Sequence, residues 1–149
     1  MNSNLLEKIY NKICIFCVNK THIKRQKQEL SFKLRCPDSI IDIAKLIKEF
    51  NGRCITIDTY KKQNDYILLY HFDVKNILIT IEIYLKNKTI NSISTVLKST
   101  IWIEQVISQQ YSIDFLDHVN MRKVFLDENM SKDLLEKYST ISEVMTNKY

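Results

Sequence analysis

Cysteine and histidine are the side chains in this sequence that could bind a metal ion or supply a nucleophile. Cys14 and Cys17 have the C-x-x-C spacing of redox and zinc sites. Cys36 and Cys54 are too widely separated to form the second close pair that a zinc site commonly uses. The first pair also falls in an apolar helical pattern, where small buried cysteines are common. The pattern therefore favours free thiols in a reducing compartment over a metal or redox centre.

The histidines do not form a recognisable catalytic group with other residues. His22, His71 and His118 have no Ser or Cys in a nucleophile setting. His118 could relay a proton because the unperturbed pKa of histidine lies near neutrality, but a hydrogen-bonded structural or interface role is commoner. His71 lies in a predicted strand and is expected to be packed. Asp58 and Asp65 flank a predicted turn, which favours a turn role over general-acid chemistry. A stand-alone enzyme is the least favoured class.

Composition excludes one large group of sites. Gly52 is the one glycine among 149 residues, whereas dinucleotide and phosphate-cradling loops need several. No apolar run reaches the ~18 residues that suggest a membrane span. The first residues also lack the basic and apolar regions of a signal peptide. We therefore expect a protein that is soluble, or peripheral to a membrane through its partners.

The net charge of +5 is unevenly spread along the chain. Between residues 20 and 35 a single acid, Glu29, is surrounded by the cations Lys20, Lys24, Arg25, Lys27, Lys33 and Arg35. Such a segment could meet nucleic acid, anionic lipid or an acidic protein surface, although a solvated loop is commoner. Phe32 is the only ring nearby, which weakens the nucleic-acid interpretation because no aromatic platform for bases is present.

Apolar periodicity predicts the elements that must position these residues. Helical spacing is present at 4–18, 40–50 and 99–110, and weakly at 134–138. Alternating or β-branched runs predict strands at 30–36, 54–58, 65–72 and 77–85, with a loop at 19–28. Asp38 and Ser39 are expected to cap the second helix, and Gly52 to end it in the left-handed conformation. The order predicts a single α+β domain over residues 1–149, with a mixed or antiparallel sheet and helices mainly on one face.

The most informative segment is 101–126, IWIEQVISQQYSIDFLDHVNMRKVFL. It resembles the signature block of the NuoC family, the thirty-kilodalton subunits of respiratory complex I. The family pattern is Asn-Trp-x-Glu-Arg-Glu-x-x-Asp-x-Phe-Gly-Ile-x-Phe, followed by His-Pro-x-Leu-Arg-Arg-Ile-Leu. The residues in register are Trp102, Glu104, Ile113, Phe115, His118 and Arg122, and similar residues stand at Tyr111, Met121, Lys123, Val124 and Phe125.

The resemblance covers about residues 37–128. Upstream, Tyr70 and His71 match the family strand Glu-Val-Val-Tyr-His-Leu, and Ser92 is also in place. Residues 1–36 add a helix, the basic loop and a strand, and 129–149 form a tail. Some positions depart from the family pattern. Glu-Arg-Glu becomes Glu-Gln-Val at 104–106, Pro becomes Val119, and Gly becomes Ser112, which is tolerable if the turn does not require positive φ. The neutralised helix face suggests a changed partner surface or a divergent, or hydrogenase-type, relative.

The resemblance implies a cofactor-free structural protein in the hydrophilic arm of an NADH:quinone oxidoreductase. Family members pack against the subunits of the quinone module, including one related to the hydrogenase large subunit, and against adjacent iron–sulfur subunits. The whole membrane-associated complex would carry iron–sulfur clusters and flavin. The chain would lie peripherally, on the cytoplasmic face in a bacterium or the matrix face in a mitochondrion.

Two alternatives stay open. One is the equivalent subunit of an energy-converting membrane-bound nickel–iron hydrogenase. The other is a small basic module that binds RNA or an acidic protein through 20–35, although no nucleic acid is expected if the resemblance holds.

The resemblance places the contact with neighbouring subunits on 101–126. The expected interface residues are Trp102, Glu104, Tyr111, Phe115, His118, Arg122 and Lys123. Trp102 could equally be a core residue of an amphipathic helix, because a buried aromatic serves both roles. Glu104 could pair with Arg122 or Lys123, face a partner, or be solvated, since exposed ion pairs contribute ~0–1 kcal/mol.

Overall fold

A computed structural model describes residues 2–18, 22–24 and 28–124. Three cations of the basic segment, Lys20, Arg25 and Lys27, lie outside the described residues, as does the helix predicted at 134–138.

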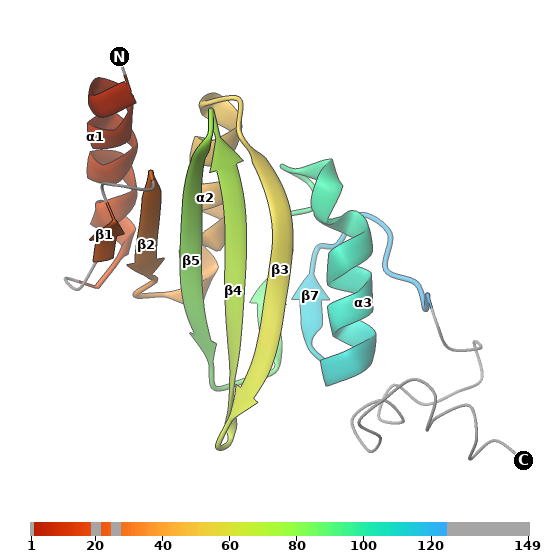
Figure 1. Ribbon diagram of the computed structural model, residues 1–149. Helices are drawn as coiled ribbons and strands as arrows, with labels where there is room; N and C mark the ends of the chain where they lie inside the picture. The colour runs from red at the N-terminus through yellow and green to blue at the C-terminus, as the bar shows by residue number, and fades with distance from the viewer. Residues whose placement is uncertain (1, 19–21, 25–27, 125–149) are drawn as a thin grey trace, which may run out of the picture.

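The fold is built on a five-stranded mixed sheet with the strand order β1-β2-β5-β4-β3 (Figure 1). Parallel pairing joins β2 to β5, and the other neighbours are antiparallel. The strands are β1 His22–Lys24, β2 Glu29–Lys33, β3 Arg53–Lys62, β4 Asp65–Val74 and β5 Ile77–Leu85. A second, two-stranded parallel sheet joins β6 Thr89–Asn91 to β7 Asp114–Leu116. The predicted α+β class with a mixed sheet is confirmed, whereas β1 replaces part of the predicted loop at 19–28.

The helices lie where apolar periodicity predicts them. They are α1 Asn2–Ile13, α2 Ile40–Glu49 and α3 Ile101–Tyr111, with short 3-10 turns at Cys14–Phe16 (η1), Pro37–Ser39 (η3) and Lys98–Thr100 (η4). In Figure 1, α2 lies behind the sheet and α3 lies beside the edge strand β3, while the front face of the sheet carries no described helix.

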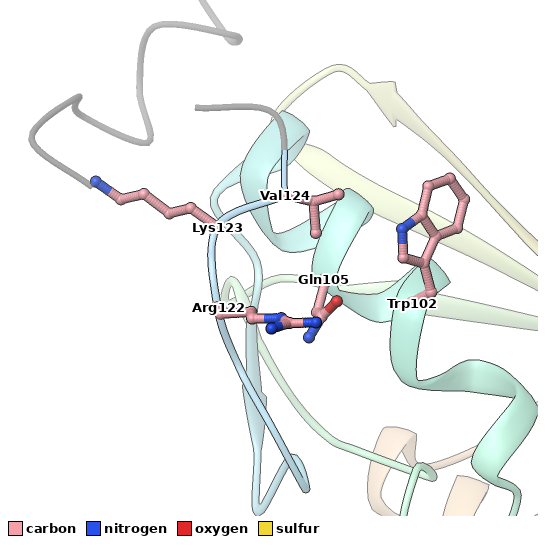
Figure 2. Close-up of a pocket in the computed structure, with 5 residues that line it drawn as sticks. All are labelled: Trp102, Gln105, Arg122, Lys123 and Val124. Carbon is pink, nitrogen blue, oxygen red and sulfur yellow. The ribbon is translucent and has the colours of Figure 1, made fainter. Parts of the chain in front are cut away.

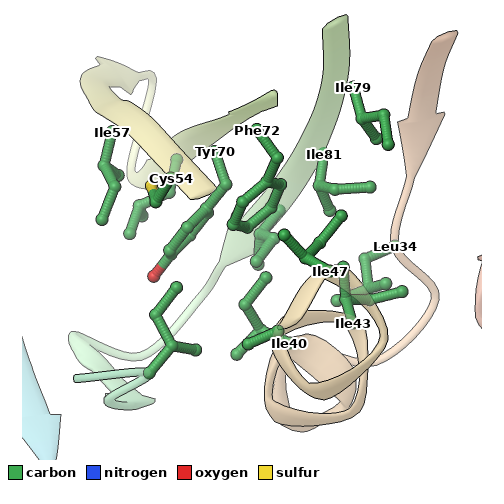
Figure 3. Close-up of a cluster of buried hydrophobic side chains, with 14 of the residues drawn as sticks. Leu34, Ile40, Ile43, Ile47, Cys54, Ile57, Tyr70, Phe72, Ile79 and Ile81 are labelled. Carbon is green, nitrogen blue, oxygen red and sulfur yellow. The ribbon is translucent and has the colours of Figure 1, made fainter. Parts of the chain in front are cut away.

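Strand alternation forms the core. Every second residue of β5, from Ile77 to Leu85, is buried, and the intervening residues are half-exposed. Facing them, α2 contributes Ile40, Ile43 and Ile47 (Figure 3). Each such side chain stabilises the fold by roughly 1.5–3 kcal/mol when it leaves water. One face of the sheet is therefore covered by α2. The edge strand β3 contacts α3.

The two ends of α2 differ from the sequence expectation. Ser39 stands at the N-cap, but neither it nor another side chain caps the helix. At the other end Asn51, with φ 56°, takes the left-handed conformation, so the prediction that Gly52 does so is wrong. Asn tolerates this conformation because its short polar side chain can bond locally. Gly52 is needed for space, since a Cβ there would lie 2.6 Å from Val74 Cγ2 and 2.9 Å from Asp73 O.

Candidate functional site

Helix α3 is enclosed by its own chain on nearly all sides. Six successive residues, Glu104 to Gln109, are buried, because the helix packs between β3 and the segment 112–124 that folds back over it. A helix buried all round does not show the amphipathic pattern of a surface helix. Trp102, in its first turn, is the exception, with 56% of its surface exposed.

Glu104 lies at the centre of a buried polar cluster. Its carboxylate accepts hydrogen bonds from Ser92 Oγ at 2.5 Å and from the Ile93 amide at 3.0 Å. His118 Nε2 stands 3.6 Å from Glu104 Oε2. Burial raises the pKa of Glu104 to about 7, although the bonds from Ser92 and Ile93 act in the opposite direction. The chain therefore carries a carboxyl group inside its fold that titrates near neutrality.

A directed chain of hydrogen bonds ties this carboxylate to the segment after α3. Because Ser92 Oγ donates to Glu104, the proton between the two hydroxyls at 2.6 Å belongs to Ser94 Oγ. Ser94 Oγ in turn accepts from the Val119 amide at 3.1 Å. The cluster thus joins the loop before η4 to the loop after β7.

His118 is a buried structural histidine in its neutral form. Its side chain is 1% exposed. The Asn120 amide donates to Nδ1 at 3.0 Å, so this nitrogen has no proton, and the proton lies on Nε2, which donates to Ile101 O at 3.1 Å. The hydrogen-bonded role favoured from the sequence fits this geometry.

The structure places three of the seven expected interface residues in the interior of this chain. Glu104, Phe115 and His118 point into this chain and are buried, because 112–124 folds back over α3. Glu104 is bonded to Ser92 and Ile93 rather than facing a partner.

The departures from the family pattern beside Glu104 are also accommodated internally. Gln105 and Val106 are buried, and Gln105 Nε2 donates to Asn120 O. The neutralised face of α3 is therefore covered by the chain itself.

The remaining expected residues stay at the surface. Trp102, Arg122, Lys123, Gln105 and Val124 line an open hollow of about 550 Å³ (Figure 2). In Figure 2 the Arg122 side chain reaches toward Gln105, whereas Lys123 extends away at the rim. Tyr111 is half-buried, with its ring edge-on to Tyr66 at 6.2 Å. The hollow is therefore lined by an exposed aromatic residue and by the Arg122 side chain, with Lys123 at its edge.

Ser112 ends α3 in the left-handed conformation, with φ 53° and ψ 37°. The turn therefore does require positive φ, and the glycine of the family pattern has a physical reason at this position. A non-glycine residue there costs roughly 1–2 kcal/mol.

The uncovered face of the sheet carries a second polar group that the sequence analysis missed. His71 Nδ1 lies 3.0 Å from Thr80 Oγ1, and Nε2 lies 3.2 Å from Asp58 Oδ2. Strand register brings these residues together, since His71 pairs with Thr80 across β4 and β5. The backbone amides around Thr80 belong to a strand paired on both sides, so β5 supplies no free amides beside Thr80 for an oxyanion hole. Thr80, His71 and Asp58 follow the order hydroxyl, imidazole, carboxylate of a catalytic triad. We interpret them as side chains of neighbouring strands that stabilise the sheet.

Cys14 and Cys17, and the two cations Lys33 and Arg35 of the basic segment, contact residues of this chain. The Sγ atoms of Cys14 and Cys17 donate to Asn11 O and Ile13 O, and burial raises the pKa of Cys17 to about 11. A buried thiol with a raised pKa, such as that of Cys17, is a poor nucleophile and a poor metal ligand. Among the described residues no three His, Cys, Asp or Glu side chains gather as a metal site. Arg35 donates to Cys17 O at 3.3 Å, and Lys33 Nζ lies 3.8 Å from the centre of the Tyr84 ring.

Comparison with known proteins identifies the class to which this fold belongs. A chain of the membrane-bound sulfane sulfur reductase (MBS), an archaeal respiratory membrane complex, superimposes with a TM-score of 0.71 at 12% identity, over 99% of this chain and 91% of that chain. The trypsin-resistant fragment (1–134) of Nqo5 superimposes with a TM-score of 0.58 at 12% identity, over 79% of this chain and 97% of that chain. These likenesses confirm the α+β fold. No curated protein sequence matches the chain.

The family itself is shown by sequence. The profile described as "Respiratory-chain NADH dehydrogenase, 30 Kd subunit" matches residues 34–143. The chain belongs to this family of subunits of respiratory NADH dehydrogenase-type complexes, as the signature block indicates. Within the described part of the chain, no helix is long and apolar enough to cross a membrane.

Proposed function

We propose that this chain is a non-catalytic assembly subunit of a complex I-type NADH:quinone oxidoreductase. It would pack through the Trp102 surface against the quinone-module subunits. The observation that carries the proposal is the 56% exposure of Trp102 in the first turn of a helix whose central residues, Glu104 to Gln109, are buried. Exposed Trp residues that stand beside Arg are characteristic of binding hot spots.

The buried cluster supports a positioning role. Glu104, Ser92, Ser94 and His118 hold the segment that carries Arg122 and Lys123 against α3. Satisfied buried polar networks rigidify the parts that they join. The chain would thereby fix neighbouring subunits at the separations that electron transfer needs. Iron–sulfur clusters and flavin would reside in those neighbours, and the complex would attach this chain to the cytoplasmic or matrix face of the membrane.

An alternative is the equivalent subunit of a related membrane complex, such as an energy-converting nickel–iron hydrogenase. This alternative is supported by the structural likeness, over 99% of this chain, to a chain of an archaeal respiratory membrane complex.

Native purification of the tagged chain from its own cells tests both assignments. We expect a hydrogenase-large-subunit-like chain and iron–sulfur subunits to co-purify, and mass spectrometry identifies them. An NADH-binding flavin subunit among them selects complex I, and a nickel–iron centre selects the alternative. Recovery of the chain alone, or with RNA in a salt-sensitive complex, contradicts the proposal.

A further inference from the structure

The hollow beside Trp102 has the electrostatic character of a site for a carboxylate. None of the five described residues that line it is acidic, and two of them are Arg122 and Lys123. Among the described residues, no carboxylate forms an ion pair with Arg122. The acid of α3, Glu104, is turned inside and bonded to Ser92 and Ile93. A guanidinium at such a surface matches a carboxylate by two parallel hydrogen bonds.

The same surface is also apolar. Trp102 is more than half exposed, and Val124 is a second apolar residue that lines the hollow. Outside the hollow, Leu116, Val119 and Met121, which precede Arg122 in the sequence, are also exposed. An exposed Trp beside a cation favours a protein contact over a site for a small anion, because Trp and Arg are enriched among the residues that dominate protein interfaces. The volume of about 550 Å³ has room for a few side chains of a bound segment.

The segment that leads to Arg122 is anchored within this chain before any partner binds. Gln105, in its floor, is bonded to Asn120 O, and Val119 is bonded to Ser94 of the buried cluster. A preformed site loses less conformational entropy on binding than a flexible one.

We propose that this hollow binds an acidic segment of a neighbouring subunit, whose Asp or Glu carboxylate meets Arg122 while an adjacent apolar side chain packs on Trp102. The inference rests on the proposed function and names the chemistry of the partner at that surface.

Charge reversal at Arg122 is the first test, made in the tagged chain within the native complex. With Arg122→Glu we expect the neighbouring subunit to co-purify at least about tenfold less, because an unpaired like charge at an interface is costly. Lys45→Glu makes the same change of charge on the solvent-facing side of α2, where the Lys45 side chain is 65% exposed. This control should leave co-purification unchanged. Equal loss in both variants overturns the inference.

A conservative variant keeps the test sharp if Arg122→Glu fails to fold. In the double variant Arg122→Lys, Lys123→Arg the positive charge is retained, and the amine that a zero-length carbodiimide can couple to a carboxylate moves from position 123 to position 122. We expect a cross-link from position 122 to an Asp or Glu of a co-purifying chain. A cross-link to the acids of residues 125–149 of this chain overturns the inference, because the hollow would then be filled from within.

The two proposals fail in different ways. If the complex assembles but position 122 gives no cross-link to a partner, the acidic-segment site is wrong and the assembly role stands. If wild-type chain purifies without oxidoreductase subunits, both are wrong.

Discussion

At the scale of single residues, Glu104 has the consequence that is most accessible to measurement. In the folded chain its carboxyl group keeps a proton up to about pH 7, whereas the ordinary pKa is 4.5. Between these values the folded state binds more protons than the unfolded state, so the free energy of unfolding falls as pH rises. The contribution is complete below about pH 4.5 and is lost as pH rises through 7.

Glu104→Gln should remove this pH dependence. We expect wild-type protein to lose a few kcal/mol of stability relative to the variant between about pH 5 and about pH 8, since one pKa unit corresponds to about 1.4 kcal/mol. Urea unfolding of both proteins at the two pH values measures the difference. Parallel curves for the two proteins would show that Glu104 titrates normally.

A substitution at Ser112 should stabilise the fold, because the serine is held in the left-handed conformation, which is strained for a residue with a Cβ. Ser112→Gly should stabilise the fold by about 0.5–1 kcal/mol, the relief of left-handed strain less the added entropy of the unfolded chain. Thermal unfolding measures the change. Ser39→Gly is the control, since Ser39 has φ −68° and gains nothing from glycine. A loss of stability in Ser112→Gly would mean that the serine side chain contributes more than its backbone costs.

At the scale of elements, the helices and the central strands could be predicted because their apolar periodicity is local. The strand Ile77–Leu85 has the same bounds in the sequence prediction and in the structure. The burial of Glu104 could not be predicted, because a lone Glu in a helix is usually solvated. Its partner Ser92 lies outside the helix, in the loop that follows β6. The strand β1 was missed because His22–Lys24 is too short and polar to alternate visibly.

Helix α3 separates folding from assembly. Trp102→Ala should leave the melting temperature within about 2–3 °C of wild type, since more than half of the residue is exposed and surface changes are usually within ±0.5 kcal/mol. The same variant should co-purify less of the neighbouring subunit. Tyr60→Ala, at 43% exposure on edge strand β3, is the matched aromatic control. If Trp102→Ala is unfolded, and assembly is lost for that reason alone, Trp102 stabilises the fold and is not a contact residue.

At the scale of the whole molecule, family membership could be predicted from spaced identities, and the α+β class from the order of the periodic segments. The exposed surface could be identified only from the three-dimensional structure. Three of the seven expected interface residues, Glu104, Phe115 and His118, are interior residues. Their types match the family pattern, but a sequence match does not say whether a residue holds its own chain together or meets another. Trp102 and Arg122 are distinguished by exposure alone.

Parallel pairing of β6 with β7 closes the chain around α3, because the two strands flank the helix in sequence. The result is a β-α-β crossover attached to one edge of the main sheet. Such a unit opens cooperatively, since the helix cannot leave without breaking the strand pair. Native-state hydrogen exchange should therefore show the amides of Ile90 and Ile107 exchanging with one common opening free energy. If the amides of α3 exchange independently of those of β6, the helix and the strand pair do not open as one cooperative unit.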